Sequence, residues 1–138
     1  PIIAPKRELP SLLDSWTVNS DNRNIDEKFV TSVNEFIERN MANEDLRISE
    51  LAQHVCMSVS NLQRKMKITF NLSAKDYIQR YRLRYATYLL GREDIGVSEI
   101  SEKVGFKTHS YFSNCFKKQY GVSPKEYKRH LLENQDKR

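Results

Sequence analysis

The sequence of 138 residues predicts an all-α fold of about seven helices, in which one long helix joins two similar units. Three observations carry this prediction. Apolar residues recur at three- and four-residue spacings along most of the chain, as in helices with one buried side. Residues typical of helix starts and ends separate these segments. Part of the pattern also occurs twice, which indicates an internal duplication.

Residues 1–25 are predicted to be a linker or the tail of a missing upstream domain, because they combine three prolines with a polar run over 17–24. Within this segment four apolar residues are spaced for one or two amphipathic helical turns: Leu9, Leu12, Leu13 and Trp16. Such a stretch either docks loosely on a neighbour or couples a regulatory domain to the rest. The sequence leaves both alternatives open.

The first unit is predicted over residues 26–72 and contains three helices. Asp26 is placed to cap a helix that ends near Met41. A short helix follows over 48–55, and Ser58 is placed to cap a third helix that ends near Phe70. The expected buried residues of the three helices are, in order, Phe29, Val33, Phe36 and Ile37; Ile48, Leu51, Ala52 and Val55; and Val59, Leu62, Met66 and Phe70.

A long helix is predicted over residues 73–91. Ser73 is placed to cap it, no residue within it breaks a helix, and Gly91 is placed to end it. Its apolar side consists of Ile78, Tyr81, Ala86, Leu89 and Leu90. Such a helix is a stiff spacer between the two units.

The second unit is predicted over residues 92–138. Gly96 opens a short helix over 97–104, and Gly121 ends the next helix in a left-handed conformation. The sequence Ser123-Pro124-Lys125-Glu126 starts a last helix that ends near Leu132, followed by a frayed tail over 133–138. The helix before Gly121 is expected to bury Tyr111, Phe112, Cys115, Phe116 and Tyr120.

The two units are copies of one pattern. A shift of 49 residues aligns Ser49, Glu50 and Val55 with Ser98, Glu99 and Val104. A shift of 50 aligns Ser60, Lys67, Ser73, Lys75 and Tyr77 with Ser110, Lys117, Ser123, Lys125 and Tyr127. One residue inserted in the second turn explains the change of register. Cys56 stands where the second copy has Gly105, so a left-handed backbone there would be strained.

The second copy resembles the second helix-turn-helix of the AraC/XylS family of bacterial transcription regulators. The matching residues are Ile100, Val104-Gly105-Phe106, Ser110-Tyr111-Phe112-Ser113, Phe116-Lys117-Lys118, Tyr120-Gly121-Val122-Ser123-Pro124 and Tyr127. The resemblance extends back to about Asp26. It implies two helix-turn-helix subdomains joined by a linker helix, and sequence-specific binding of double-stranded DNA, with two recognition helices in successive major grooves about 34 Å apart. It also implies RNA polymerase as a partner, while activation and repression of transcription cannot be told apart from the sequence. The lack of a membrane-spanning stretch and of a signal peptide indicates a cytoplasmic protein.

The region from Asp26 to Lys67 and the residue Asn114 also resemble the output domain of hybrid two-component sensors. Asn114 falls where the AraC/XylS family often has arginine. This second resemblance implies an upstream receiver or sensor domain in the full-length protein. The signal, the target sequence and the oligomeric state cannot be read from the sequence.

Positive charge collects around the two expected recognition helices. Residues 57–90 hold seven basic residues and one acidic residue, and residues 105–130 hold six and one. Residues 26–56 instead hold three basic and seven acidic residues. A basic segment alone is often only a solvated surface, but here it coincides with the motif.

The outward rows of the two recognition helices supply the candidate site residues. Arg64 suits guanine, while Gln63 and Asn114 suit adenine. Weaker or water-mediated base contacts are expected from Ser60, His109, Ser110 and Ser113. Contacts to DNA phosphates, which do not depend on sequence, are expected from Lys67, Lys117 and Lys118.

Other classes of protein fit less well. The chain lacks a phosphate-binding glycine loop, a nucleophile elbow and clustered carboxylates, so we expect neither an enzyme nor a cofactor. Two cysteines and three scattered histidines do not form a metal site, and Cys56 and Cys115 are expected to pack in cores. No stretch is apolar enough to span a membrane, so no membrane contact is expected. RNA binding fits less well than DNA, and a helical adaptor that binds protein is the main alternative.

Overall fold

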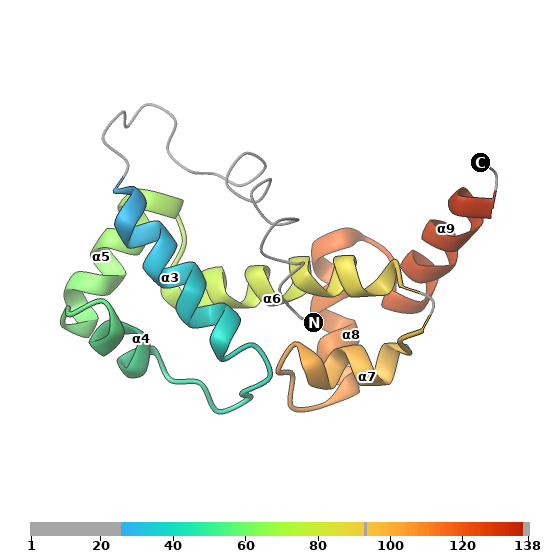
Figure 1. Ribbon diagram of the computed structural model, residues 1–138, viewed down its shortest axis with the longest axis horizontal. Helices are drawn as coiled ribbons and strands as arrows, with labels where there is room; N and C mark the ends of the chain where they lie inside the picture. Colours follow the sequence, from blue (N-terminus) through green and yellow to red (C-terminus); the bar gives the residue numbers. More distant parts are fainter. Residues whose placement is uncertain (1–25, 93, 137–138) are drawn as a thin grey trace. The chain divides into compact units, whose positions relative to one another are not determined.

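The computed structural model describes residues 26–92 and 94–136. The upstream segment 1–25, with its predicted amphipathic turns, lies outside the described residues. Within the described ranges the chain forms seven helices and no strand, which confirms the all-α prediction (Figure 1). The helices are α3 (Glu27–Arg39), α4 (Ile48–His54), α5 (Val59–Phe70), α6 (Ala74–Leu90), α7 (Val97–Lys103), α8 (His109–Tyr120) and α9 (Pro124–Asp136).

The described residues form two compact units. The first contains residues 26–40 and 45–81, and the second contains residues 41–44 and 82–136. The boundary lies inside α6, between Tyr81 and Arg82. Each unit therefore includes one half of the helix that the sequence analysis treated as a separate linker.

The first unit begins at a capped helix. The side chain of Asp26 accepts a hydrogen bond from the backbone N–H of Phe29 at 3.0 Å, as expected for an N-cap. The buried residues of α3 are Phe29, Val30, Val33 and Ile37. Phe36, which was expected to be buried, is only half-buried, and its ring lies 5.0 Å from the ring of His54.

Helix α4 packs against both α3 and α5 in the first unit (Figure 1). Leu51 and Ala52 are buried as predicted, whereas the flanking Ile48 and Val55 are half-buried. In α5 the predicted core residues Leu62, Met66 and Phe70 are buried. The prediction for Val59 is wrong, because this first residue of the helix lies at the rim of the core and is exposed.

Two tyrosines of α6 complete the first core. The ring of Tyr77 stacks on Phe70 with 4.0 Å between ring centroids, and its hydroxyl donates to Oδ1 of Asn34 at 2.6 Å. The hydroxyl of Tyr81 donates to Glu38. Burial raises the pKa of both hydroxyls above the ordinary value, so both stay neutral donors at physiological pH. The periodicity identified Tyr81 but not Tyr77.

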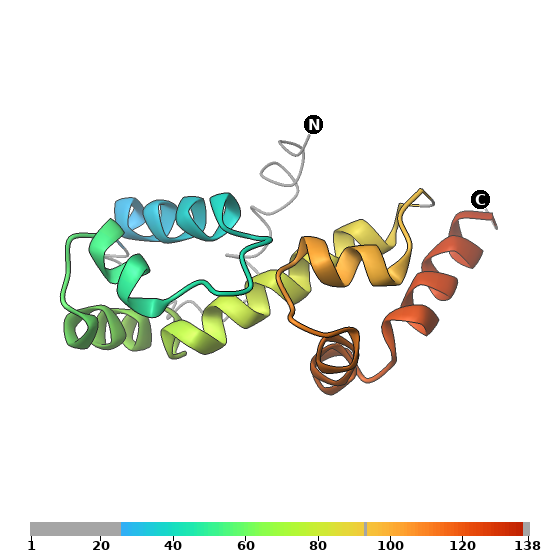
Figure 2. The same ribbon diagram turned by 90° about the horizontal axis from the view of Figure 1, so that it is seen from below.

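The second unit is built around aromatic residues of α8. Phe112 and Phe116 are fully buried, and the ring of Phe116 meets that of Tyr127 edge-on at 5.4 Å. Helix α8 is seen nearly along its axis in Figure 2, while α7 and α9 are seen from the side, so α8 crosses both steeply. Other buried apolar residues of this unit are Met41, Leu83, Tyr85, Ala86, Leu89, Leu90, Ile95, Ile100, Val104 and Phe106.

Helix α9 starts as predicted but ends later. The hydroxyl of Ser123 accepts a hydrogen bond from the backbone N–H of Glu126 at 3.2 Å, and Pro124 is the first helical residue. The helix then continues to Asp136. The predicted end near Leu132, with a frayed tail after it, is therefore wrong for residues 133–136, because no residue there breaks the helix.

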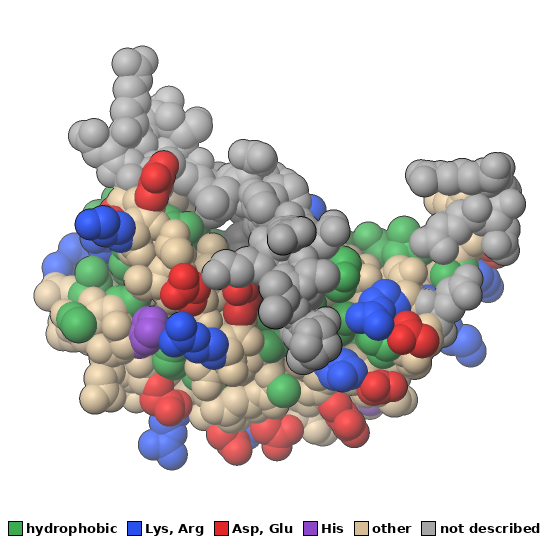
Figure 3. Space-filling model, viewed as in Figure 1, with side chains coloured by type: hydrophobic (Ala, Val, Ile, Leu, Met, Phe, Trp, Pro, Cys, Tyr) green, Lys and Arg blue, Asp and Glu red, His purple; other side chains and the backbone are tan. Residues whose placement is uncertain are grey.

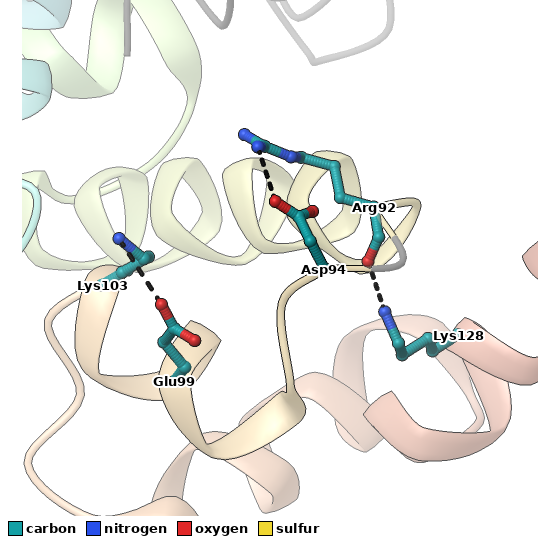
Figure 4. A network of polar contacts seen from close by, with 5 residues as sticks. All are labelled: Arg92, Asp94, Glu99, Lys103 and Lys128. Atoms are coloured by element: carbon teal, nitrogen blue, oxygen red, sulfur yellow. Dashed lines mark hydrogen bonds and ion pairs between the residues drawn. The ribbon is translucent and has the colours of Figure 1, made fainter. Parts of the chain in front are cut away.

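Polar contacts close the end of α6 (Figure 4). Nζ of Lys128, on α9, donates to the carbonyl oxygens of Leu90 at 3.4 Å and of Arg92 at 2.5 Å. The guanidinium of Arg92 in turn donates to Asp94 at 3.1 Å, which lowers the pKa of that carboxyl. Lys128 therefore satisfies carbonyl groups that a helix end leaves without partners in the helix.

Two negative findings hold for the described ranges. None of the helices in this part of the chain is long and apolar enough to cross a membrane. No group of three or more histidine, cysteine, aspartate or glutamate side chains in these residues could hold a metal ion.

Candidate nucleic-acid interface

The first helix-turn-helix consists of α4, a tight turn and α5. The N–H of Cys56 donates to the carbonyl of Gln53 at 3.0 Å, and that of Met57 donates to Ala52 at 2.9 Å. Cys56 is left-handed with φ of 59°. The hydroxyl of Ser58 then caps α5 by accepting from Asn61 N–H at 3.1 Å. The structure therefore confirms the predicted cap.

The second helix-turn-helix repeats this turn. The N–H of Gly105 donates to Glu102 at 3.1 Å, and that of Phe106 donates to Ser101 at 3.2 Å, which are the first copy's bonds 49 residues later. Gly105 is left-handed with φ of 79°. The cap of α8 is Thr108, whose hydroxyl accepts from the N–H of Tyr111 at 3.0 Å. The sequence analysis misses Thr108, although threonine before an apolar run is an ordinary helix-start signal.

Arg82 fixes the second turn from the core side. Its guanidinium donates to the carbonyl oxygen of Gly105 at 3.4 Å and to that of Asn43 at 2.7 Å. A Cβ atom on Gly105 would lie 2.4 Å from the carbonyl oxygen of Met41 and 2.9 Å from Cζ of Arg82. Desolvation lowers the pKa of Arg82 from its usual high value. Arg82 therefore holds the turn at Gly105 through hydrogen bonds, and the sequence analysis does not identify this residue.

The outward face of α5 carries three exposed residues of the predicted site: Ser60, Arg64 and Lys67. The guanidinium of Arg64 donates to Oδ1 of Asn61 at 2.9 Å. Asn61 is exposed and was missed by the sequence analysis, although its amide has the same hydrogen-bonding groups as the predicted adenine readers.

Gln63 is the exception in the first row. It is half-buried, and its Oε1 accepts a hydrogen bond from the backbone N–H of Ala74 at 2.9 Å. Ala74 is the first residue of α6, so Gln63 satisfies one of the free N–H groups at the start of that helix. Its predicted contact with adenine stays a prediction.

The outward face of α8 carries the second row. Five predicted residues are exposed, and Ser113 is half-buried; the exposed ones are His109, Ser110, Asn114, Lys117 and Lys118. The prediction for Tyr111 is wrong, because 49% of this residue is exposed. It lies at the edge of the apolar stripe, where its ring is tilted against that of Phe106 at 5.7 Å between centroids.

The two cysteines differ from their predicted placement. Cys56 is exposed, because the left-handed turn directs it away from the core that α4 and α5 share. Cys115 is half-buried and interacts with Tyr111, whose pKa it raises through a side-chain hydrogen bond. Both thiols are free.

The side chains expected to contact DNA phosphates lie on α5 and α8, not on α3 or α4. In Figure 3 the surface over α3 and α4 shows acidic and basic side chains side by side, so this face is not a basic patch. Lys65 of α5 forms an ion pair with Asp26 at 2.8 Å and lies 4.8 Å from the centroid of the Phe29 ring.

A pocket of about 420 Å³ lies beside the first recognition helix. We call it the Ile68 pocket, and its lining residues are Asp26, Met57, Asn61, Arg64, Lys65, Ile68 and Thr69. Ile68 is 54% exposed, which is unusual for a large apolar side chain and had not been anticipated.

The fold and the two outward rows define a tandem helix-turn-helix protein. Residues 51–130 match the family described as "Helix-turn-helix domain", in its AraC type. The chain belongs to the AraC/XylS family of DNA-binding helix-turn-helix proteins.

Relatives extend over most of the chain. It is 36% identical over 109 residues to Histidine kinase P4 of Formosa agariphila. This match covers 79% of the chain but only 8% of the kinase. It is 34% identical over 89 residues to the Msm operon regulatory protein of Streptococcus mutans, which covers 64% of the chain and 32% of that regulator. The chain thus spans less than half the length of these two relatives.

A solved structure has the same fold. The C-terminal domain of the two-component response regulator yesN from Fusobacterium nucleatum is 29% identical to the chain, with a TM-score of 0.66. The match covers 73% of this chain and 98% of that domain. The chain is therefore similar to the C-terminal domain of a two-component response regulator.

Proposed function

We propose that this chain is the sequence-specific DNA-binding part of a larger transcription regulator, with α5 and α8 as its two recognition helices. One observation carries the proposal: both copies of the helix-turn-helix present an exposed polar and basic row on their second helix, while the opposite side of that helix is buried. In helix-turn-helix proteins the second helix enters the major groove. The two helices would occupy neighbouring grooves, one turn of DNA apart.

Base reading is assigned to the side chains that can match groove edges. Arg64 donates two parallel hydrogen bonds to guanine, and Asn114 pairs with adenine. Each such pair discriminates by about 1–3 kcal/mol against the wrong base. Ser60, His109, Ser110 and Ser113 add weaker contacts, and Gln63 reads adenine only if its bond to Ala74 is exchanged for one to the base.

Affinity that does not depend on sequence is assigned to three lysines. Lys67, Lys117 and Lys118 are exposed on the same helices and would neutralise DNA phosphates. Each phosphate neutralised contributes about 0.9 to the slope of log affinity against log salt. Backbone N–H groups at the starts of α5 and α8 support the same contacts.

The regulatory setting is part of the proposal. Similarity to a histidine kinase and to the C-terminal domain of a response regulator supports an upstream receiver or sensor domain that controls DNA binding in the cytoplasm. RNA polymerase is the proposed partner at the promoter, with activation of transcription as the outcome.

The test is selection of preferred sites from a random DNA pool, followed by titration of two variants. Arg64→Ala should lower affinity for the selected site and relax its sequence preference. Lys117→Ala should weaken selected and random DNA alike and reduce the salt slope by about 1. Equal losses on both DNAs for Arg64→Ala would remove its base-reading role. A protein-binding adaptor, the alternative function, would select no site and show no log-linear salt dependence.

A further inference from the structure

Arg64, the proposed guanine reader of the first recognition helix, is held by a neighbouring side chain of the same helix. Its Nη1 donates to Oδ1 of Asn61, about one helical turn earlier on α5, at 2.9 Å. Both residues are exposed on the outward side of the helix. The contact therefore joins a proposed base reader to a residue that has no role in the proposed function.

Asn61 is itself fixed by the start of the helix. It is the third residue of α5, and its backbone N–H donates to the hydroxyl of the cap residue Ser58 at 3.1 Å. A long arginine side chain loses much more rotamer freedom when it is held than a short asparagine side chain does. An amide on a capped first turn is therefore a firm support for the more flexible guanidinium of Arg64.

The contact leaves the base-reading edge of Arg64 available. An arginine side chain carries only N–H donors, arranged in a planar fork. Asn61 accepts from Nη1, so the parallel N–H pair on Nε and Nη2 can still bond O6 and N7 of a guanine. Because the amide of Asn61 is neutral, the guanidinium also keeps its positive charge uncompensated for the negative field of a DNA groove.

A stronger acceptor lies nearby but is already engaged. The carboxylate of Asp26 lines the Ile68 pocket together with Arg64. Oδ2 of Asp26 accepts from Nζ of Lys65 at 2.8 Å, and Oδ1 accepts from the N–H of Phe29 at 3.0 Å. A charged pair with arginine would be stronger than a bond to a neutral amide. Since Lys65 neutralises this carboxylate, the guanidinium of Arg64 stays with the amide on the outward side of the helix.

The second copy of the helix-turn-helix carries a different pair at these positions. A shift of 50 residues aligns Asn61 with Tyr111 and Arg64 with Asn114. The third helical position thus accepts a tyrosine, whose hydroxyl interacts with Cys115. The amide acceptor is present in the copy that has the arginine and is replaced in the copy that lacks it. Asn61 therefore accompanies Arg64 and is not required by the fold.

We propose that Asn61 is a positioning residue for base reading, which holds the guanidinium of Arg64 with its Nε and Nη2 edge directed at a guanine. This inference rests on the function proposed above and adds a specificity determinant to it. Holding a long side chain in advance removes an ordering cost from binding, which corresponds to about two- to tenfold in affinity. The gain falls on the guanine contact, so it should appear on the selected DNA site and not on random DNA.

The experiment compares affinities for the selected site and for random DNA. Asn61→Ala should lower affinity for the selected site about two- to tenfold and leave random DNA unchanged. Asn61→Asp keeps an oxygen acceptor but has no N–H donor. It should therefore keep the ratio between selected and random DNA, while its negative charge weakens both alike. The matched control is Asn134→Ala, an exposed asparagine of α9, which should change neither affinity.

A double-mutant cycle separates positioning from direct base reading. If Asn61 acts through Arg64, Asn61→Ala should lower affinity less than about twofold in an Arg64→Ala background. Additive losses would make Asn61 an independent base reader and would overturn the proposal. An Asp variant that loses preference as fully as the Ala variant would overturn it as well, because the N–H donor and not the acceptor would then matter. So would equal losses on selected and random DNA for Asn61→Ala.

A second readout needs no DNA. NMR relaxation of the Nε–H group measures how restricted the Arg64 guanidinium is. Asn61→Ala should increase its motion, and Asn61→Asp should not. Equal motion in the wild type and in Asn61→Ala would overturn the holding contact. A wild type that selects no DNA site would instead overturn the proposed function, and the base-reading role of Asn61 with it, whatever the NMR result.

Discussion

Cys56 and Gly105 adopt the same left-handed backbone conformation at the same point of the two helix-turn-helix copies, with φ of 59° and 79°. Glycine reaches this conformation without a steric penalty, whereas a residue with a Cβ atom pays roughly 1–2 kcal/mol. The first turn therefore holds strain that the second does not.

We expect Cys56→Gly to raise the free energy of unfolding by about 0.5–1 kcal/mol, because relief of strain exceeds the extra backbone entropy that glycine loses on folding. Cys56 is exposed, so its side chain contributes little packing. The control is Asn71→Gly at the end of α5, where φ is 58° but asparagine tolerates the conformation. Urea unfolding measures both, and an equal gain in the two variants would contradict the strain assigned to Cys56.

Gly105→Ala should destabilise the protein strongly, by about 3 kcal/mol or more. The added Cβ atom would lie 2.4 Å from the carbonyl oxygen of Met41, so backbone must move in addition to the left-handed strain. Gly121→Ala is a matched control, because Gly121 is left-handed with φ of 82° but has no atom within 4 Å of its added Cβ. It should cost only about 1 kcal/mol. Similar losses in thermal or urea unfolding would show that the crowding around Gly105 relaxes freely.

Gln63→Ala should lower stability by about 1 kcal/mol, because the N–H of Ala74 loses its acceptor at the start of α6. Gln63→Glu keeps an acceptor and should retain most of that stability. Ser60→Ala, an exposed change on the same helix, should stay within about 0.5 kcal/mol of the wild type. Site selection on the same variants separates the cap from base reading: a Gln63→Ala protein of unchanged stability but altered preference would reverse our assignment.

The stability contributed by Asp26 should fall in acid. The hydrogen bond from Lys65 and that from the N–H of Phe29 lower the pKa of Asp26 below its ordinary 3.8. A carboxyl whose pKa is lower in the folded state stabilises the fold above the unfolded pKa, and this stability is lost as the pH falls through the folded pKa. Asp26→Asn keeps a capping oxygen without the charge. The free energy of unfolding of Asp26→Asn should be lower than that of the wild type at neutral pH. This difference should shrink below about pH 4.

The ion pair itself is checked by repeating this comparison in a Lys65→Met background. In that background Asp26→Asn should lower the free energy of unfolding by less at neutral pH, because the main cause of the lowered Asp26 pKa, the hydrogen bond from Lys65, is gone. An unchanged deficit would mean that the cap alone, without Lys65, supports Asp26.

Much of the fold was predictable because local signals determine it. Caps at Asp26, Ser58 and Ser123 and the left-handed Gly121 place helix boundaries through hydrogen bonds made within a few residues. The exposed rows of α5 and α8 follow from the helical period alone. These features need no knowledge of the tertiary structure.

The sequence-based predictions were wrong or incomplete where tertiary packing determines burial and hydrogen-bond partners. The period places Tyr111 and Val59 on apolar stripes, but it does not say how far the core extends toward a helix start. Gln63 has the composition of a base reader, yet the position of Ala74 turns it inward. Arg82 looks like another surface cation of α6, and only the approach of Gly105 and Asn43 reveals its use.

The division of α6 between Tyr81 and Arg82 has a practical consequence for building chimeras. A graft that carries only residues 26–72 into another scaffold would leave behind Tyr77 and Tyr81, and Phe70 would lose its stacking partner. Exchange of the first DNA-reading module between relatives should therefore retain α6 through Tyr81. Residues 41–44 contact the second unit, so a chimera should keep the recipient's own residues at these positions.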